Sequence, residues 1–94
     1  MALFVLVCID KSNSLDLRLA TRQAHLAYAS QFSGITKLGG PFLDDDGQMA
    51  GSLIILDVED KAAAQAFTDN DPYTKAGLFE RVEVRAFRAT LGQL

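Results

Sequence analysis

This chain of 94 residues has few side chains that can do chemistry, since it contains one histidine and one cysteine. The single cysteine, Cys8, cannot form a disulfide within the chain, which favours a reducing compartment, the cytoplasm. The apolar run at residues 2–9 is too short to span a membrane and lacks the basic segment of a cleaved leader. The positive charges are scattered among acids, and the net charge is −3. We therefore expect no membrane and no nucleic-acid partner.

The motifs of common cofactor sites are also absent. The chain has no phosphate-binding loop, dinucleotide fingerprint, zinc-ligand spacing or nucleophile elbow. The acidic turn at residues 44–46 lacks the spaced ligands and the terminal glutamate of a calcium loop. We expect neither a metal nor a cofactor.

The pattern along the chain predicts the order strand, helix, strand, strand, helix, strand. Apolar and β-branched runs indicate the strands, and capping residues such as Ser14 and Asp60 indicate where the helices begin. The expected strands are 3–9, 35–43, 51–58 and 80–89, and the expected helices are 14–32 and 60–70. This order predicts one domain over residues 1–94, of the α+β class. The expected fold is ferredoxin-like βαββαβ, an antiparallel four-stranded sheet with both helices on one face.

The first helix has an apolar stripe. Leu15, Leu19 and Leu26 lie on one face at helical spacing with Ala29 close to it, so we expect this face to pack on the core. Gly34 suits the C′ position that ends the helix.

Two strands contain continuous apolar runs instead of alternation, the strand at 3–9 along its length and the strand at 51–58 at its centre, Leu53-Ile54-Ile55-Leu56. Such a pattern predicts that both faces of the strand are covered. One layer of helices covers only one face of the sheet. We therefore expect a second copy of the chain on the other face, that is, a homodimer.

His25 and Asp71 are the best candidates for chemistry. An imidazole exchanges protons near neutral pH, and a neighbouring carboxylate fixes its tautomer. Each residue alone also has an ordinary explanation, because His25 lies on a helix flank and Asp71 precedes Pro72 as a helix cap. Tyr73 is a packing residue or offers its hydroxyl to a ligand.

Two further segments have both a structural and a functional interpretation. Gly39, Gly40 and Pro41 form a strand bulge or let a ligand approach the backbone closely. Arg18 and Arg22 attract an anionic substrate or are solvated residues of a helix flank.

Taken together, these residues resemble the YCII-related family of small dimeric α+β proteins. The resemblance covers nearly the whole chain and rests on the apolar first strand, Arg22 with His25, Gly39-Gly40-Pro41, Gly51-Ser52, Ala64-Gln65-Ala66-Phe67, Asp71-Pro72-Tyr73 and Ala76-Gly77. It implies a ferredoxin-like fold that dimerises as an α+β barrel, with His25 and Asp71 as the catalytic pair. It also implies lyase-like elimination on hydroxylated aromatic rings.

The leading hypothesis is a cofactor-independent lyase or isomerase that acts on a small oxygenated molecule, cyclic or aromatic. His25 and Asp71 are its expected catalytic residues. The expected substrate-binding residues are Arg22, Gly39, Gly40, Pro41 and Tyr73. One alternative is a non-catalytic dimer that binds or senses a small molecule, and another is a structural interaction module with His25 on its surface. The residues alone leave these three open.

Overall fold

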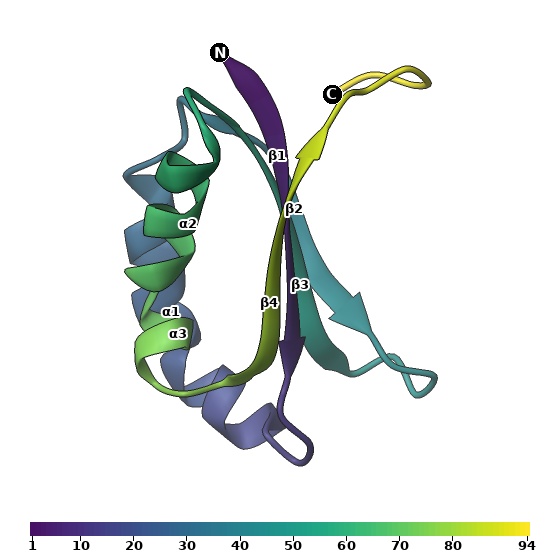
Figure 1. Cartoon of the computed structure of the whole chain (residues 1–94). Coiled ribbons are helices and arrows are strands. Elements are labelled where there is room, and N and C mark those ends of the chain that lie inside the picture. Colours follow the sequence, from purple (N-terminus) through teal and green to yellow (C-terminus); the bar gives the residue numbers. More distant parts are fainter.

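The fold is a single sheet with helices on one of its faces (Figure 1). It is described by a computed structural model that covers residues 1–94. The elements in chain order are β1 (Ala2–Asp10), α1 (Leu15–Ser30), β2 (Thr36–Leu43), β3 (Met49–Val58), α2 (Lys61–Asp69), α3 (Pro72–Lys75) and β4 (Phe79–Phe87). The four strands are antiparallel and lie in the order β2-β3-β1-β4. The predicted ferredoxin-like fold is confirmed. None of the helices is long and apolar enough to cross a membrane.

The hydrophobic core lies between the sheet and the helices. β1 contributes Phe4, Leu6 and Cys8 to it, and β4 contributes Val84, which lies opposite Leu6. Helix α2 packs over β1, β3 and β4 and inserts Phe67, which is buried. The core is therefore built mainly by α2 and the central strands, and α1 takes little part in it.

The other face of the sheet carries no helix, as Figure 1 shows. Residues paired across antiparallel strands point to the same face. Val5 lies opposite Ile55, and Val7 opposite Leu53, so an apolar strip runs along β1 and β3 on this face. None of these side chains belongs to the core between sheet and helices.

Short-range signals place the hairpin turn and the cap of α2 as expected. In the β2–β3 hairpin, Asp44 Oδ1 accepts hydrogen bonds from the backbone N–H groups of Asp46 and Gln48, at 2.9 Å each. Gly47 follows with a φ of 80°, which favours glycine. At the start of α2, Asp60 Oδ1 accepts from the backbone N–H of Ala63 at 2.9 Å.

The predicted inward face of α1 is wrong. Leu19 and Leu26 are each 50% exposed, whereas Arg18 on the neighbouring face is only 3% exposed. Helix α1 packs against α3 and not closely on the sheet. The inward side chains of α1 therefore border a cavity beside the core. A cavity of this kind accommodates polar side chains such as Arg18 and His25.

The predicted end of α1 is also wrong. The helix ends at Ser30, and its C-cap is Gln31 in right-handed helical conformation. Gly34 does not adopt the positive φ of a C′ glycine. The hydroxyl of Ser14 at the N-cap donates to Ser12 O and makes no capping bond.

Candidate functional site

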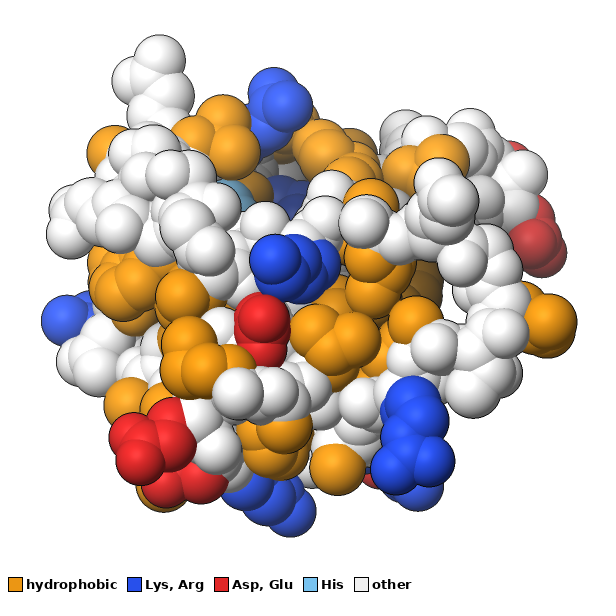
Figure 2. All heavy atoms as spheres, turned by 90° about the horizontal axis from the view of Figure 1, so that it is seen from above, with side chains coloured by type: hydrophobic (Ala, Val, Ile, Leu, Met, Phe, Trp, Pro, Cys, Tyr) orange, Lys and Arg blue, Asp and Glu red, His pale blue; other side chains and the backbone are white.

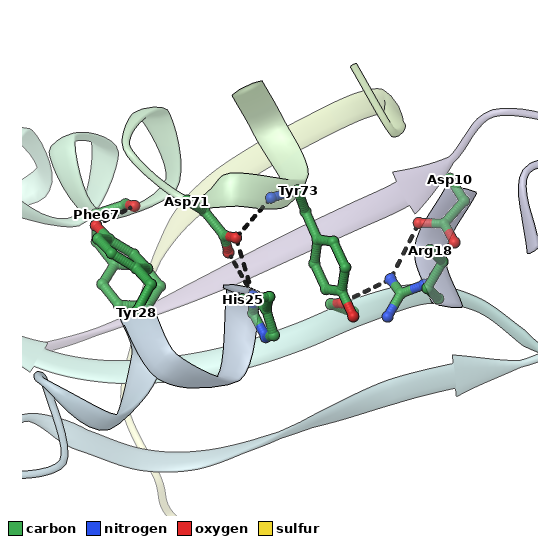
Figure 3. Close-up of polar contacts among 8 residues, drawn as sticks. Asp10, Arg18, His25, Tyr28, Phe67, Asp71 and Tyr73 are labelled. Atoms are coloured by element: carbon green, nitrogen blue, oxygen red, sulfur yellow. Dashed lines mark hydrogen bonds and ion pairs between the residues drawn. The ribbon is translucent and has the colours of Figure 1, made fainter. Parts of the chain in front are cut away.

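His25 and Asp71 meet, although they lie 46 positions apart in the chain. The imidazole Nδ1 is 2.9 Å from Asp71 Oδ1 and 3.0 Å from Oδ2 (Figure 3). The two side chains are 13% and 4% exposed, so the contact is nearly closed to water on the carboxylate side. The pairing that each residue alone could not establish is present in the fold.

Asp71 is held in place by its own helix. It is the N-cap of α3, and Pro72 follows at the first helical position. Asp71 Oδ1 accepts a hydrogen bond from the backbone N–H of Tyr73 at 2.9 Å. The carboxylate is therefore held in position by its own helix. The hydrogen bond from the backbone of Tyr73 and the contact with His25 are formed together.

The geometry also sets which imidazole nitrogen carries the proton. A carboxylate accepts hydrogen bonds, so Nδ1 of the neutral ring is the donor to Asp71, an assignment made from the hydrogen-bond partners. Nε2 is then the basic nitrogen. Figure 3 shows it on the side of the ring away from Asp71. In this orientation Nε2 has a free lone pair that can accept a proton.

Tyr73 lies between two side chains of α1. Its ring stacks on His25 with a centroid separation of 4.1 Å and an interplanar angle of 15°. The guanidinium carbon of Arg18 lies 4.6 Å from the centroid of the same ring. Burial raises the pKa of Tyr73 above its ordinary value, so its hydroxyl stays protonated at neutral pH. The ring fixes the plane of the imidazole.

Arg18 is the buried charge of the site. It donates through Nε to Asp10 Oδ2 at 2.7 Å and through a terminal nitrogen to Asp10 Oδ1 at 3.0 Å. The same terminal nitrogen donates to Ser52 Oγ at 2.8 Å. Burial acts to lower the pKa of Arg18, but the hydrogen bonds and the charge of Asp10 outweigh it and raise that pKa. Because Ser52 Oγ accepts from Arg18, its own proton is free to be donated elsewhere.

These side chains border one cavity of about 270 Å³ between α1 and the strands β2 and β3. Its lining is Arg18, Arg22, His25, Leu26, Ala29, Thr36, Gly39, Gly40, Pro41, Met49, Ser52, Ile54, Phe67 and Tyr73. In Figure 2 the pale-blue side chain of the single histidine is recessed among hydrophobic and basic side chains. The cavity is slightly smaller than the roughly 300–1,000 Å³ of sites for drug-sized ligands. A cavity of about 150 Å³ holds benzene, so one substituted ring fits here.

The glycines of β2 form part of the cavity wall. Strand pairing continues through Gly39, Gly40 and Pro41, and the irregularities in register lie on either side of them. A Cβ on Gly40 would meet no atom within 4 Å, so no close packing requires glycine there. These residues do not form the bulge that one interpretation expected, and they border the space that a ligand would fill.

Comparison with known proteins identifies the family of this chain. The family model of the YCII-related domain matches residues 2–88. Protein YciI of Escherichia coli O6:H1 (strain CFT073) is 38% identical over 94 residues, which cover 92% of this chain and 96% of that protein. The chain belongs to the YCII-related family.

Two solved structures illustrate the range of likeness to this YCII-related chain. One is the 5-chloro-2-hydroxyhydroquinone dehydrochlorinase TftG from Burkholderia phenoliruptrix AC1100, in complex with 2,5-dihydroxybenzoquinone. It is 36% identical with a TM-score of 0.85, over 92% of this chain and 93% of that one. The other, a dimeric ferredoxin-like protein from Jannaschia sp. CCS1, is 21% identical with a TM-score of 0.50, over 95% and 100%. The second likeness shows the fold alone.

Sequence reasoning missed part of the site in this YCII-related chain. It left Arg18 as a residue that attracts anions or is solvated, and it gave Asp10 and Ser52 no function. The structure joins these three residues in one buried network. Only the isolated charge of Asp10 at the end of an apolar strand hinted at a buried partner, and nothing local named Arg18 as that partner.

Proposed function

We propose that this protein is a cofactor-independent lyase or isomerase that acts on a small oxygenated ring, with His25 as its general base and acid. One observation carries the proposal. Nδ1 of His25 is anchored on Asp71, and the ring borders a cavity of the size of one substituted ring. An imidazole held by a carboxylate beside a ligand-sized cavity is the arrangement that general acid–base catalysis needs.

The chemistry moves one proton and one electron pair. Nε2 of His25 takes a proton from a hydroxyl or a carbon of the substrate, and the electron pair left behind forms a C=O or C=C bond. In a lyase reaction a leaving group departs with its bonding pair, and in an isomerase reaction Nε2 returns the proton to another carbon. Asp71 stabilises the imidazolium that forms in between. The hydroxyl of Tyr73 and the walls at Gly39, Gly40 and Pro41 hold the ring.

The likeness to the dehydrochlorinase supports a lyase. That protein removes chloride from a hydroxylated ring and shares 36% of its residues with this chain. Dehydrochlorination is the loss of a proton and a halide, which is a reaction that a positioned base assists. General acid–base assistance contributes typically about 10²–10⁴-fold, enough for a ring already activated by hydroxyl groups.

The direct test is turnover. The assays follow release of chloride from 5-chloro-2-hydroxyhydroquinone and loss of absorbance in a panel of small hydroxylated rings. They compare the wild type with His25→Ala and with Asp71→Asn. We expect His25→Ala to lower kcat/KM by at least about 100-fold and Asp71→Asn by at least about tenfold. Gln23→Ala, an exposed position of the same helix outside the cavity, is the matched control and should retain activity.

Full turnover in His25→Ala would contradict an acid–base function of the histidine. Binding of the same rings without turnover in the wild type would favour the alternative, a small-molecule binding or sensing protein.

We also propose that the protein acts as a homodimer in the cytoplasm. The apolar strip formed by Val5, Val7, Leu53 and Ile55 on the open face of the sheet supports a second copy there. The single free cysteine, Cys8, supports a reducing compartment.

A further inference from the structure

The cavity is lined by basic side chains and by no acidic ones. Its lining contains two arginines and one histidine but no aspartate or glutamate. Two carboxylates contact lining residues, and both are hydrogen-bonded there: Asp71 accepts from His25 and the backbone of Tyr73, and Asp10 accepts from Arg18. With the His25 ring neutral, the two carboxylates equal the two arginines in number, but neither carboxylate belongs to the lining of the cavity.

The two arginines differ in whether their charge is paired with a carboxylate. The charge of Arg18 is matched by Asp10 through two hydrogen bonds, and its second partner is the neutral hydroxyl of Ser52. Arg22 forms no ion pair and no side-chain hydrogen bond, and it is exposed at the cavity. Its guanidinium is the one uncompensated full charge that faces a ligand.

Arg22 is also correctly placed relative to the base. Residues three apart on a helix are neighbours on its surface, so Arg22 and His25 lie side by side on α1. A ligand atom held by Arg22 is therefore next to the imidazole. The rest of the lining is mostly apolar, from residues such as Leu26, Met49 and Ile54, and this suits a flat ring.

We infer that the cavity selects a monocyclic ligand that carries an ionised oxygen, a phenolate, enolate or carboxylate, and that Arg22 binds that oxygen. The inference rests on the proposed function for the position of the reacting atoms, but the binding preference itself requires no turnover. Arg22 holds the charged oxygen, Ser52 donates its free proton to a second oxygen, and the ring lies against the apolar wall.

Two probes of equal size separate charge from shape, namely benzoate and benzamide. Each is a flat ring with a three-atom substituent, and only benzoate is charged. Dissociation constants are measured by NMR titration of the labelled full-length protein at low ionic strength. We expect benzoate to bind roughly tenfold more tightly than benzamide, with shifted signals at Gly39, Gly40 and Ser52.

Variants assign the preference to one side chain. In Arg22→Gln the two probes should bind within about twofold of each other, whereas Arg22→Lys should keep most of the preference because it keeps the charge. Arg81→Gln removes an exposed arginine of β4 outside the cavity and should leave the preference unchanged. Added salt should reduce the wild-type preference.

The inference is overturned if benzoate and benzamide bind the wild type equally, if neither binds up to about 10 mM, or if the preference survives in Arg22→Gln. The outcome is separable from that of the proposed function. An anion preference without turnover of any ring would support this inference and refute the proposed enzyme function. Turnover without an anion preference would support the enzyme function and refute this inference.

Discussion

At the scale of single residues, the site uses side chains that each satisfy a structural requirement and a chemical one. Asp71 caps α3 and orients His25. Tyr73 fills a buried position and forms the stacking surface of the imidazole. Because the same side chains serve the fold and the site, their structural functions are enough to explain their presence in the sequence. Local sequence signals therefore do not indicate the site.

Tyr73 provides the sharpest test at this scale. In Tyr73→Phe the stack on His25 remains and only the hydroxyl is lost, so we expect kcat to fall by less than about fivefold. In Tyr73→Leu the aromatic face is lost, and stacking of this kind is worth about 0.5–1.5 kcal/mol. We expect a fall in kcat of at least tenfold and broadened or doubled NMR signals of the His25 ring, which report a ring that is no longer held in one orientation. Equal activity of the two variants would show that the stack does not position the imidazole.

Cys8 makes a prediction about pH. Burial raises the pKa of its thiol from an ordinary 9.0 to about 11. Between these values the unfolded chain has lost the thiol proton and the folded chain retains it, so the free energy of unfolding falls as pH rises through this interval. The contribution of one group is at most about 3 kcal/mol.

Urea unfolding at pH 8, 9, 10 and 11 checks this expectation. The Cys8→Ala variant, although less stable at pH 8, should lose less stability between pH 9 and pH 11 than the wild type. Parallel curves for the two proteins would show that the thiol does not contribute to the alkaline loss.

At the scale of elements, the chain shows which features local pattern can predict. The strands, the hairpin and the caps at Asp60 and Asp71 follow from neighbouring residues, and they were predicted correctly. The buried face of α1 was predicted incorrectly, because the pattern of Leu15, Leu19 and Leu26 indicated a face that is largely exposed. A helix that borders a cavity turns polar residues inward, and here the buried Arg18 forms an ion pair with Asp10 at the end of β1.

Gly51 of β3 lies close to the backbone of β1, the strand with which it pairs. A Cβ built on Gly51 would collide with the backbone oxygen of Cys8, and backbone atoms of paired strands cannot easily move. Gly51→Ala should therefore lower the free energy of unfolding by about 1–3 kcal/mol. Gly40→Ala is the matched control, since no atom lies within 4 Å of the added Cβ. Chemical unfolding of both variants measures the difference, and equal stability would refute the steric requirement.

At the scale of the whole molecule, the uncovered sheet face predicts self-association. Val7→Lys places a charge in the apolar strip and should convert a species of two chains into one of single chains. Leu19→Lys makes the same kind of change on the exposed side of α1 and should leave the mass unchanged. Light scattering coupled to size exclusion measures both. A wild type that has the mass of one chain at all concentrations would contradict the homodimer.

The overall fold could be predicted because strand order and helix placement follow from the sequence pattern and the resemblance to a family. The site could be predicted only in part. His25 and Asp71 were singled out because few other residues offer chemistry, and the expected lining residues do border the cavity. The network of Arg18, Asp10 and Ser52 could not be foreseen, because its members come from three elements that only the tertiary structure brings together.

In the proposed mechanism, His25 presents a basic Nε2 to the cavity because Asp71 holds Nδ1–H. Nitrogen-15 NMR of the His25 ring at a pH where the ring is neutral tests this most directly. We expect a protonated Nδ1 and an unprotonated Nε2, and a loss of this single tautomer in Asp71→Asn. A proton on Nε2 in the wild type would contradict it, because the ring could not then act as the base.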